Sequence, residues 1–168
     1  MTGAVTWVTA GTAAAETTTF RDGPGKDRQG PANSLAWVRV QYAEKPRVVW
    51  TLKVEKLVKN NTRAFATIYW PDDSTIRLET KHKNGTLKVK GYDSATETTF
   101  RDGLTARWNY QRDTVTFVLT SHLRPWNERA VFDGFTVMKG AFHGPHCEPA
   151  PATGTCNDDW ATGRVEKG

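Results

Sequence analysis

The sequence predicts an all-β protein, a single-domain antiparallel β-sandwich of jelly-roll or immunoglobulin-like type. Apolar and polar residues alternate with period two in segment after segment, turn signals separate the segments, and no window shows a helical stripe. Strands that recur about every 8–12 residues with turns between them are typical of sandwiches and barrels. A chain of 168 residues is long enough to bury one such core without metals.

The first predicted strands are residues 36–42 and 47–54, in which every second residue is apolar. Residues 63–70 are apolar on both faces, which predicts a central strand. That strand ends at Pro71-Asp72-Asp73-Ser74, a sequence typical of turns.

The strongest local signal is Asn84-Gly85, between the predicted strands 76–83 and 86–90. A type I′ hairpin turn requires positive φ at both central residues, which Asn and Gly tolerate best. The remaining predicted strands are residues 104–110, 114–120 and 130–138.

The string TTTFRDG at 17–23 is echoed by TTFRDG at 98–103, which we interpret as coincidence or as two similar strand starts rather than a duplication.

Residues 17–140 are expected to form the sandwich. Residues 1–16 are predicted to be a flexible arm or a signal-peptide remnant, because Ala13-Ala14-Ala15 fits the pattern read by signal peptidase. No apolar run approaches the roughly 18–20 residues of a membrane span, so none is expected.

Residues 141–168 are predicted to be a C-terminal loop segment that packs back on the sandwich. Its two cysteines, Cys147 and Cys156, would close a short loop, which favours a disulfide in an oxidising setting. A zinc site with His143 and His146, or free thiols, are the alternatives.

Positive charge is concentrated in the middle of the chain. Residues 45–90 hold eleven Lys and Arg against four acids, a net +7, while the remainder of the chain is −2. A basic surface attracts polyanions, although lysines on exposed strand faces also prevent aggregation.

Tryptophans at strand ends can stack on a sugar or enter a partner surface, whereas Trp37 and Trp108 are interpreted as core. The predicted ligand or partner contacts are Lys53, Arg77, Lys81, Lys88, Trp70, Trp126 and Trp160.

The residues show no catalytic pattern, and we predict that the protein is not an enzyme. No serine stands in a G-x-S-x-G motif, and Ser121-His122 are neighbours that a strand would point to opposite faces. Acids suited to glycosidase chemistry are scattered over strand ends, at Asp102, Asp113, Glu128 and Asp133.

A Gly-rich acidic loop gives the one cofactor candidate. Asp22 and Asp27, joined by Asp158 from the far end of the chain, would be calcium ligands. Because Lys26 lies among them and the D-x-D-x-D-G spacing is lacking, a solvated turn is the competing interpretation, and no other cofactor is expected.

FRDGPGKDRQGPANSLAWVRVQYAEKPRVVWTLKVEKL, GLTARWNYQRDTVTFVLTSHL and NDDWATGR together resemble secreted single-domain β-sandwich proteins of high-GC Gram-positive bacteria. The resemblance covers roughly residues 17–125 and 157–164. It implies the fold and a secreted location, and it implies no activity. The chain departs from the group in lacking mid-chain cysteines and in having Lys26 before Asp27.

These observations predict a non-catalytic surface binding module for polysaccharide or another envelope polyanion, acting outside the cell. The alternative is a structural virion protein, such as a phage capsid or tail decoration protein on the virion surface. The expected partner is an anionic glycan or a protein surface, with a homo-oligomer as a further alternative. Specific nucleic-acid binding is not expected.

Overall fold

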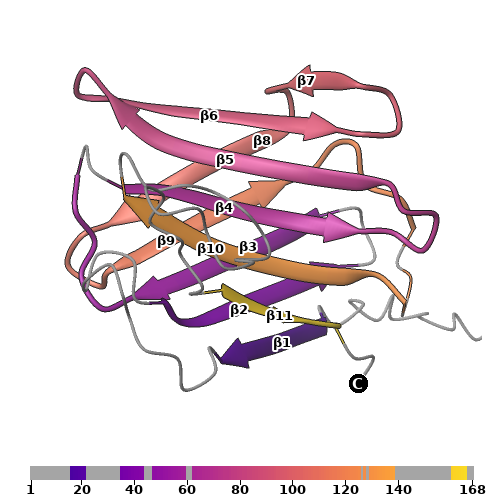
Figure 1. The fold of residues 1–168 in the computed structure, drawn as a ribbon, viewed down its shortest axis with the longest axis horizontal. Coiled ribbons are helices and arrows are strands. Elements are labelled where there is room, and N and C mark those ends of the chain that lie inside the picture. Colours follow the sequence, from indigo (N-terminus) through magenta and orange to yellow (C-terminus); the bar gives the residue numbers. More distant parts are fainter. Residues whose placement is uncertain are drawn as a thin grey trace, which may run out of the picture.

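The computed structural model describes residues 16–21, 35–43, 47–59, 62–125, 127, 129–138 and 160–165. These residues form eleven β-strands in two antiparallel sheets packed face to face, so the predicted β-sandwich is confirmed (Figure 1). The described residues contain no helix that is long and apolar enough to cross a membrane.

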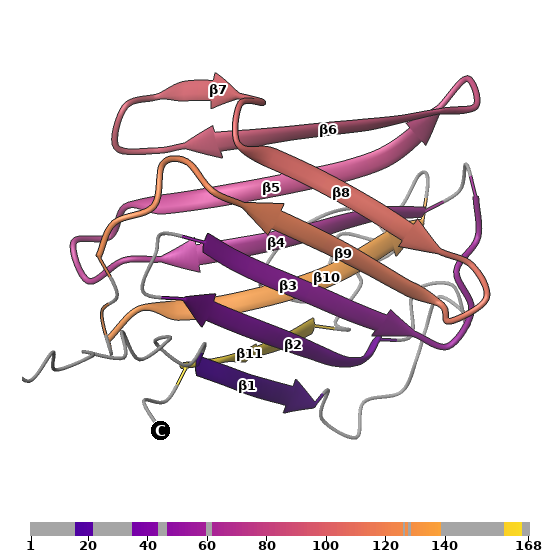
Figure 2. The ribbon, with the colours of Figure 1, turned by 180° about the vertical axis from the view of Figure 1, so that it is seen from behind.

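One sheet has five strands in the order β1-β2-β3-β9-β8, and Figure 2 shows it from its outer side. Its strands are β1 (Glu16–Arg21), β2 (Leu35–Ala43), β3 (Arg47–Val54), β9 (Thr114–Leu119) and β8 (Leu104–Asn109). The other sheet has six strands in the order β11-β10-β4-β5-β6-β7. Its strands are β11 (Trp160–Gly163), β10 (Val131–Met138), β4 (Thr62–Tyr69), β5 (Thr75–Lys83), β6 (Thr86–Asp93) and β7 (Thr98–Phe100).

The chain meanders through β1–β3, crosses to the other sheet for β4–β7, and returns for β8 and β9. β9 pairs with β3, and β10 then crosses back to pair with β4. Each sheet therefore contains strands from both halves of the chain, and these non-local pairings bind the sandwich into one unit.

The core lies between the sheets and follows from side-chain alternation. β3 has Val48, Trp50, Leu52 and Val54 buried, with partly exposed residues between them. Trp50 lies against Phe132 of the opposite sheet, with ring centroids 6.0 Å apart. Fully burying a large apolar side chain contributes about 1.5–3 kcal/mol, so these aromatic contacts hold the two layers together.

The sheets approach closely where β10 crosses the five-stranded sheet. A Cβ atom on Gly134 would lie 2.9 Å from Val38 Cγ2 and 3.2 Å from Leu52 Cγ. Only glycine allows this contact between layers, because real Cβ atoms do not approach that closely.

The predicted hairpin turn is confirmed. Asn84 and Gly85 both have positive φ, 52° and 76°, and Lys83 pairs with Thr86 across the turn. The predicted central strand is confirmed as β4, which has neighbours on both sides and is buried on both faces. The predicted turn after it is also present, with Asp73 at φ 62°.

Three strands were not predicted, and all are short or at sheet edges: β1, β7 and β11. The two similar strings fall at β1 and β7, one edge strand in each sheet, which agrees with similar strand starts rather than a duplication. The C-terminal stretch contains β11, which pairs with β10, where a loop was expected.

The prediction that Trp37 belongs to the core is wrong. Val38 and Val40 take the inner positions of β2, so alternation turns Trp37 to the outer face of the five-stranded sheet. Trp108 does lie in the core, as predicted.

Candidate functional site

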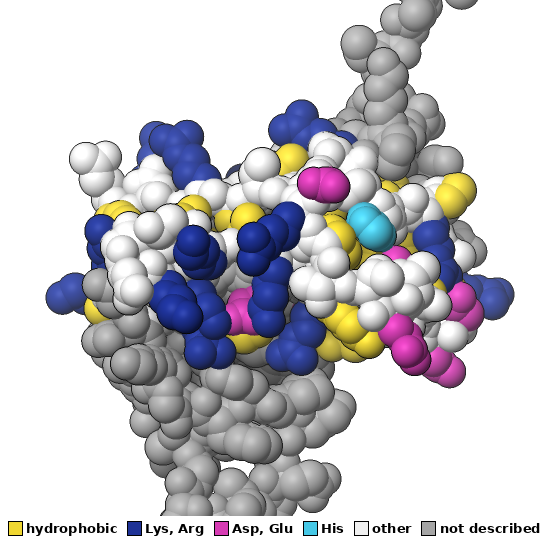
Figure 3. Space-filling model, turned by 90° about the horizontal axis from the view of Figure 1, so that it is seen from above, with side chains coloured by type: hydrophobic (Ala, Val, Ile, Leu, Met, Phe, Trp, Pro, Cys, Tyr) yellow, Lys and Arg dark blue, Asp and Glu magenta, His cyan; other side chains and the backbone are white. Residues whose placement is uncertain are grey.

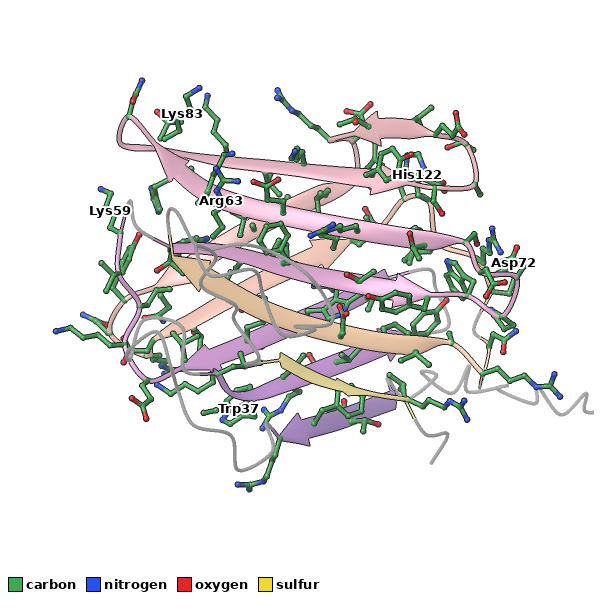
Figure 4. The ribbon with its side chains drawn as sticks, viewed as in Figure 1. Trp37, Lys59, Arg63, Asp72, Lys83 and His122 are labelled. Carbon is green, nitrogen blue, oxygen red and sulfur yellow. The ribbon has the colours of Figure 1, made fainter. Side chains whose placement is uncertain are left out.

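The outer face of the six-stranded sheet gathers a group of basic side chains. Lys81 of β5 is the direct partner of Lys88 on β6 and of Arg63 on β4. Direct partners point to the same side of a sheet, so the three cations share one face. Figure 3 shows Lys and Arg side chains clustered there, and Figure 4 labels Arg63 and Lys83.

Two adjoining hollows lie among these cations, with volumes of about 350 and 260 Å³. They share Glu79 and Lys90, so they form one groove along the β5–β6 hairpin, which we call the basic groove. The first hollow is lined by Arg63, Phe65, Arg77, Glu79, Lys90, Gly91, Tyr92 and Thr99. The second is lined by Glu79, Lys81, Lys83, Lys88, Val89, Lys90 and Arg101.

Glu79 is the acid at the centre of the basic groove and is only 9% exposed. Its carboxylate contacts Lys90 Nζ at 2.9 Å, Lys81 Nζ at 3.1 Å and Arg63 Nη1 at 3.7 Å. Burial acts to raise the pKa of Glu79, but hydrogen bonds from Lys90 and Lys81 outweigh it and lower that pKa. Glu79 is therefore ionised at neutral pH, and it organises cations that outnumber it.

Cations outnumber acids in the described lining of the groove. Seven Lys and Arg side chains line the two hollows, and Glu79 is the one acid among the described lining residues. Lys81 and Lys88 face each other directly, an arrangement that is destabilising by itself. An anion in the groove would relieve this repulsion and accept charge-assisted hydrogen bonds.

The two ends of the basic groove differ in chemistry. The end at the hairpin turn is lined mainly by lysines, whereas the other end combines a guanidinium, an aromatic ring and a hydroxyl. There Arg77 lies over the Phe65 ring, with its Cζ 5.0 Å from the ring centroid, and Tyr92 is 42% exposed. An exposed tyrosine beside an arginine suits a sugar ring that carries an acidic group.

A buried carboxyl group lies in the same cross-strand row as Arg77. Asp133 of β10 opposes Thr67 of β4, which opposes Arg77. Asp133 is fully buried, and Tyr69 Oη donates a hydrogen bond to its Oδ2 at 2.8 Å. Burial raises the pKa of Asp133 to about 6, against the opposing effect of the hydrogen bonds from Tyr69 and Thr67.

The placement of Asp133 corrects its interpretation as a strand-end acid, because it lies inside β10. Asp113 does lie in a turn, where its Oδ1 accepts a hydrogen bond from Leu57 N at 2.9 Å and its Oδ2 contacts Lys53 at 3.5 Å. Asp102 lies in the turn before β8, and Glu128 is outside the described residues.

Ser121 and His122 make separate contacts, as their adjacency predicts. Ser121 Oγ donates to the backbone oxygen of Asp102. His122 stacks on Phe100, with ring centroids 3.9 Å apart, and its Nδ1 lies 3.4 Å from Asp93 Oδ2. Both side chains thus have structural contacts of their own.

The predicted contact residues do not form one surface. Arg77, Lys81 and Lys88 line the basic groove, but Lys53 lies on the outer face of the opposite sheet, where it contacts Asp113. Alternation alone shows that a residue faces outward without showing from which sheet.

The prediction that Trp70 presents its ring to a ligand is wrong. Trp70 is 4% exposed and belongs to the core cluster, and Arg124 covers it with its Cζ 5.5 Å from the ring centroid. Its position continues the inward alternation of Ala66 and Ile68, so its ring enters the core.

The side chains of Trp126 and Trp160, the calcium candidates Asp22, Asp27 and Asp158, and Cys147 and Cys156 lie outside the described residues. The charged groove residues that the sequence does not single out as contacts are Arg63, Glu79, Lys83, Lys90 and Arg101, and the exposed aromatic residue is Tyr92. The alternation through Lys88 and Lys90 continues to Tyr92, and this signal was present in the sequence.

No protein-family model, no curated protein sequence and no solved structure matches the chain.

Proposed function

We propose that this protein is a non-catalytic binding module for an anionic polysaccharide of a cell envelope, and that it acts outside the cell. The observation that carries the proposal is the basic groove, in which seven Lys and Arg side chains surround one buried acid. The signal-peptidase-like Ala13-Ala14-Ala15 supports an extracellular location.

Polyanion binding fits the groove better than binding of a small neutral ligand. The groove is shallow and divided, and its lining is dominated by long cationic side chains on two adjacent strands. Such a surface gains affinity from many weak charge contacts and from counterion release along a polymer. Tyr92 adds an aromatic ring at one end, which favours a carbohydrate over a polyphosphate.

The experiment is affinity electrophoresis and calorimetry of the full chain with polygalacturonate and dextran sulfate, with neutral dextran as the reference polymer. We expect retardation by the two acidic polymers alone, and an affinity that falls linearly with salt on logarithmic axes. Equal retardation by neutral dextran would refute the proposal.

A pair of charge-matched variants tests the groove itself. Lys81→Ala/Lys88→Ala removes two groove cations, and Lys56→Ala/Arg129→Ala removes two exposed cations that do not line it. The groove variant should weaken binding by roughly tenfold and reduce the salt slope by about one for each lost contact. Equal losses in both variants would show that net charge alone drives binding and would overturn the assignment of the groove.

A further inference from the structure

A second and larger hollow lies on the opposite side of the sandwich, on the outer face of the five-stranded sheet. Its volume is about 720 Å³, within the range of about 300–1,000 Å³ found for ligand sites. It is lined by Trp37, Arg39, Thr51, Lys53, Arg107, Asn109, Gln111, Arg112, Thr114 and Thr116. We call it the threonine trough, after its floor.

The shape of the trough follows from side-chain size and strand order. Its floor is formed by Thr51 of β3 and by Thr114 and Thr116 of β9, the strands that lie between β2 and β8. Thr51 and Thr116 are direct partners, with their hydroxyl oxygens 3.5 Å apart. Longer side chains on the flanking strands rise on both sides of these short residues.

Each wall carries an arginine in the same cross-strand row. Arg39 of β2 opposes Thr51, Thr51 opposes Thr116, and Thr116 opposes Arg107 of β8. The two guanidinium groups therefore lie on opposite sides of the hydroxyl floor. Figure 4 labels Trp37, which is the neighbour of Arg39 on the same wall.

The described lining of the trough carries positive charge only. Four of the lining residues are Lys or Arg, and none of the described lining residues is acidic. Asp113 contacts Lys53 at 3.5 Å but does not line the hollow. The basic groove, in contrast, has Glu79 at its centre.

One guanidinium group and one turn of the trough are held in position by contacts within the protein. Arg39 Cζ lies 5.1 Å from the centroid of the Trp37 ring, and Arg39 Nε donates to Thr19 Oγ1 at 3.3 Å. Asn109 Oδ1 accepts hydrogen bonds from the backbone N–H groups of Gln111 and Arg112, both at 3.1 Å. These contacts fix the wall guanidinium and the turn that carries Arg112, which reduces the entropy lost on binding.

We propose that the threonine trough binds a short segment of acidic carbohydrate, with its carboxylate or sulfate groups on Arg39 and Arg107 and its hydroxyls on the threonine floor. Planar guanidinium groups donate paired hydrogen bonds to such anions, and hydroxyl and amide groups match sugar hydroxyls as both donors and acceptors.

Nucleic acid fits the trough less well. Single strands are bound by several aromatic platforms on which successive bases stack. Trp37 is the one aromatic residue among the described lining residues, and Arg39 already lies over its ring. The trough is thus distinct from the basic groove in position and in chemistry, and its occupation does not depend on the function proposed for the groove.

The test is a titration of the isotope-labelled full chain with a uronic-acid tetrasaccharide, followed by amide chemical shifts and calorimetry. The background is Lys81→Ala/Lys88→Ala, so that the basic groove contributes little. We expect shift changes at Thr51, Thr116 and Arg107. Adding Arg39→Ala/Arg107→Ala to that background should weaken binding by about tenfold or more, since each lost charge-assisted contact acts on that scale.

A further variant tests whether the loss of binding comes from a folding defect, and further ligands test the class of molecule that binds. Thr116→Val keeps the side-chain shape at a partly buried strand position and removes one floor hydroxyl, so it should weaken binding in a chain that folds normally. Maltotetraose should bind at least about tenfold more weakly, because it has no acidic group. Tighter binding of a tetranucleotide than of the tetrasaccharide would overturn the proposal.

The two proposals, for the trough and for the groove, can be refuted independently. Tetrasaccharide binding that survives Arg39→Ala/Arg107→Ala refutes the trough and leaves the basic groove untouched. In the Arg39→Ala/Arg107→Ala background, polymer binding that Lys81→Ala/Lys88→Ala leaves unchanged refutes the groove and leaves the trough untouched.

Discussion

Lys81 and Lys88 are direct cross-strand partners in the β5–β6 hairpin, so two lysine side chains leave the same face of the six-stranded sheet at one register position. Opposite charges in such a pair stabilise a sheet, whereas like charges destabilise it. The contact of Lys81 Nζ with Glu79 Oε1 at 3.1 Å offsets part of the cost that two like charges impose on this pair.

Lys88→Glu should consequently stabilise the fold and weaken polyanion binding in the same molecule. The new carboxylate would pair with Lys81, raising the free energy of unfolding by about 0.2–1 kcal/mol. Urea unfolding measures the gain, and calorimetry with polygalacturonate measures the lost affinity.

Arg129→Glu is the matched control, because it makes the same change of charge at an exposed residue that lines neither the basic groove nor the threonine trough. It should leave the unfolding free energy within about 0.5 kcal/mol of the starting protein. A Lys88→Glu variant that unfolds more easily than the parent would contradict the cross-strand argument.

A hydrogen bond across the core links the two sheets at Thr80. Trp108 Nε1 donates to Thr80 Oγ1 at 3.3 Å, and Thr80 Oγ1 donates to the backbone oxygen of Lys88 at 3.0 Å. Thr80→Val keeps the shape but leaves the buried indole N–H without its acceptor, which should cost about 1–3 kcal/mol.

Chemical denaturation monitored by tryptophan fluorescence checks this value. Thr80→Ser keeps the hydroxyl and loses one methyl group, so it should cost clearly less than Thr80→Val if the hydrogen bond is what matters. The reverse order would show that packing of the methyl group dominates.

The short edge strand β7 is held by an aromatic ring over a glycine. A Cβ atom on Gly91 of β6 would collide with the ring of Phe100, which is 8% exposed. Gly91→Ala should therefore destabilise the protein by about 1–3 kcal/mol through overpacking.

The variant Phe100→Leu tests whether a clash with the Phe100 ring causes this loss of stability. Leucine is smaller, so the double variant Gly91→Ala/Phe100→Leu should be more stable than the sum of the two single effects predicts. A thermal-unfolding double-mutant cycle measures this coupling, and strict additivity would exclude a direct clash.

Strand positions were predictable because a buried face imposes period two on the sequence. The turn at Asn84-Gly85 also fixes register: in a two-residue hairpin, Lys83 pairs with Thr86, and Lys81 must then pair with Lys88. Part of the basic groove could thus be predicted from one turn and the alternation of two strands.

Strand-end position is misleading at Trp70, and alternation with polar neighbours is misleading at Trp37, because parity within the strand decides which side each ring takes. Trp37 is out of phase with Val38 and Val40, and Trp70 is in phase with Ile68. Parity therefore places the Trp37 side chain on the outer face of its sheet and the Trp70 side chain in the core.

Sheet membership was not predictable from local pattern. Lys53 and Lys81 are both outward-facing residues, but β3 and β5 belong to opposite layers. The pairing of β9 with β3 decides this, and it depends on contacts between residues far apart in the sequence. The short strands β7 and β11 have too few residues to show a period at all.

The buried carboxyl of Asp133 predicts an unusual pH dependence of stability. An ordinary aspartate in the unfolded chain has a pKa of about 4, whereas burial raises the pKa of Asp133 to about 6 in the folded protein. Between these values the folded state binds more protons than the unfolded state. The contribution of Asp133 to stability therefore falls as the pH rises from about 4 to about 6, and it stays low above that range.

Asp133→Asn removes this titration and keeps an oxygen that can accept the hydrogen bond from Tyr69. The variant should gain stability relative to the parent as the pH rises through this window. The change in that difference between about pH 4 and about pH 7 is on the order of 2–3 kcal/mol. Urea unfolding of both proteins over this pH range measures it.

Tyr69→Phe, which removes the donor to Asp133 Oδ2, should raise the upper limit of the window, because the hydrogen bond favours the carboxylate. A stability difference between parent and Asp133→Asn that does not vary with pH would show that Asp133 titrates normally in the folded protein.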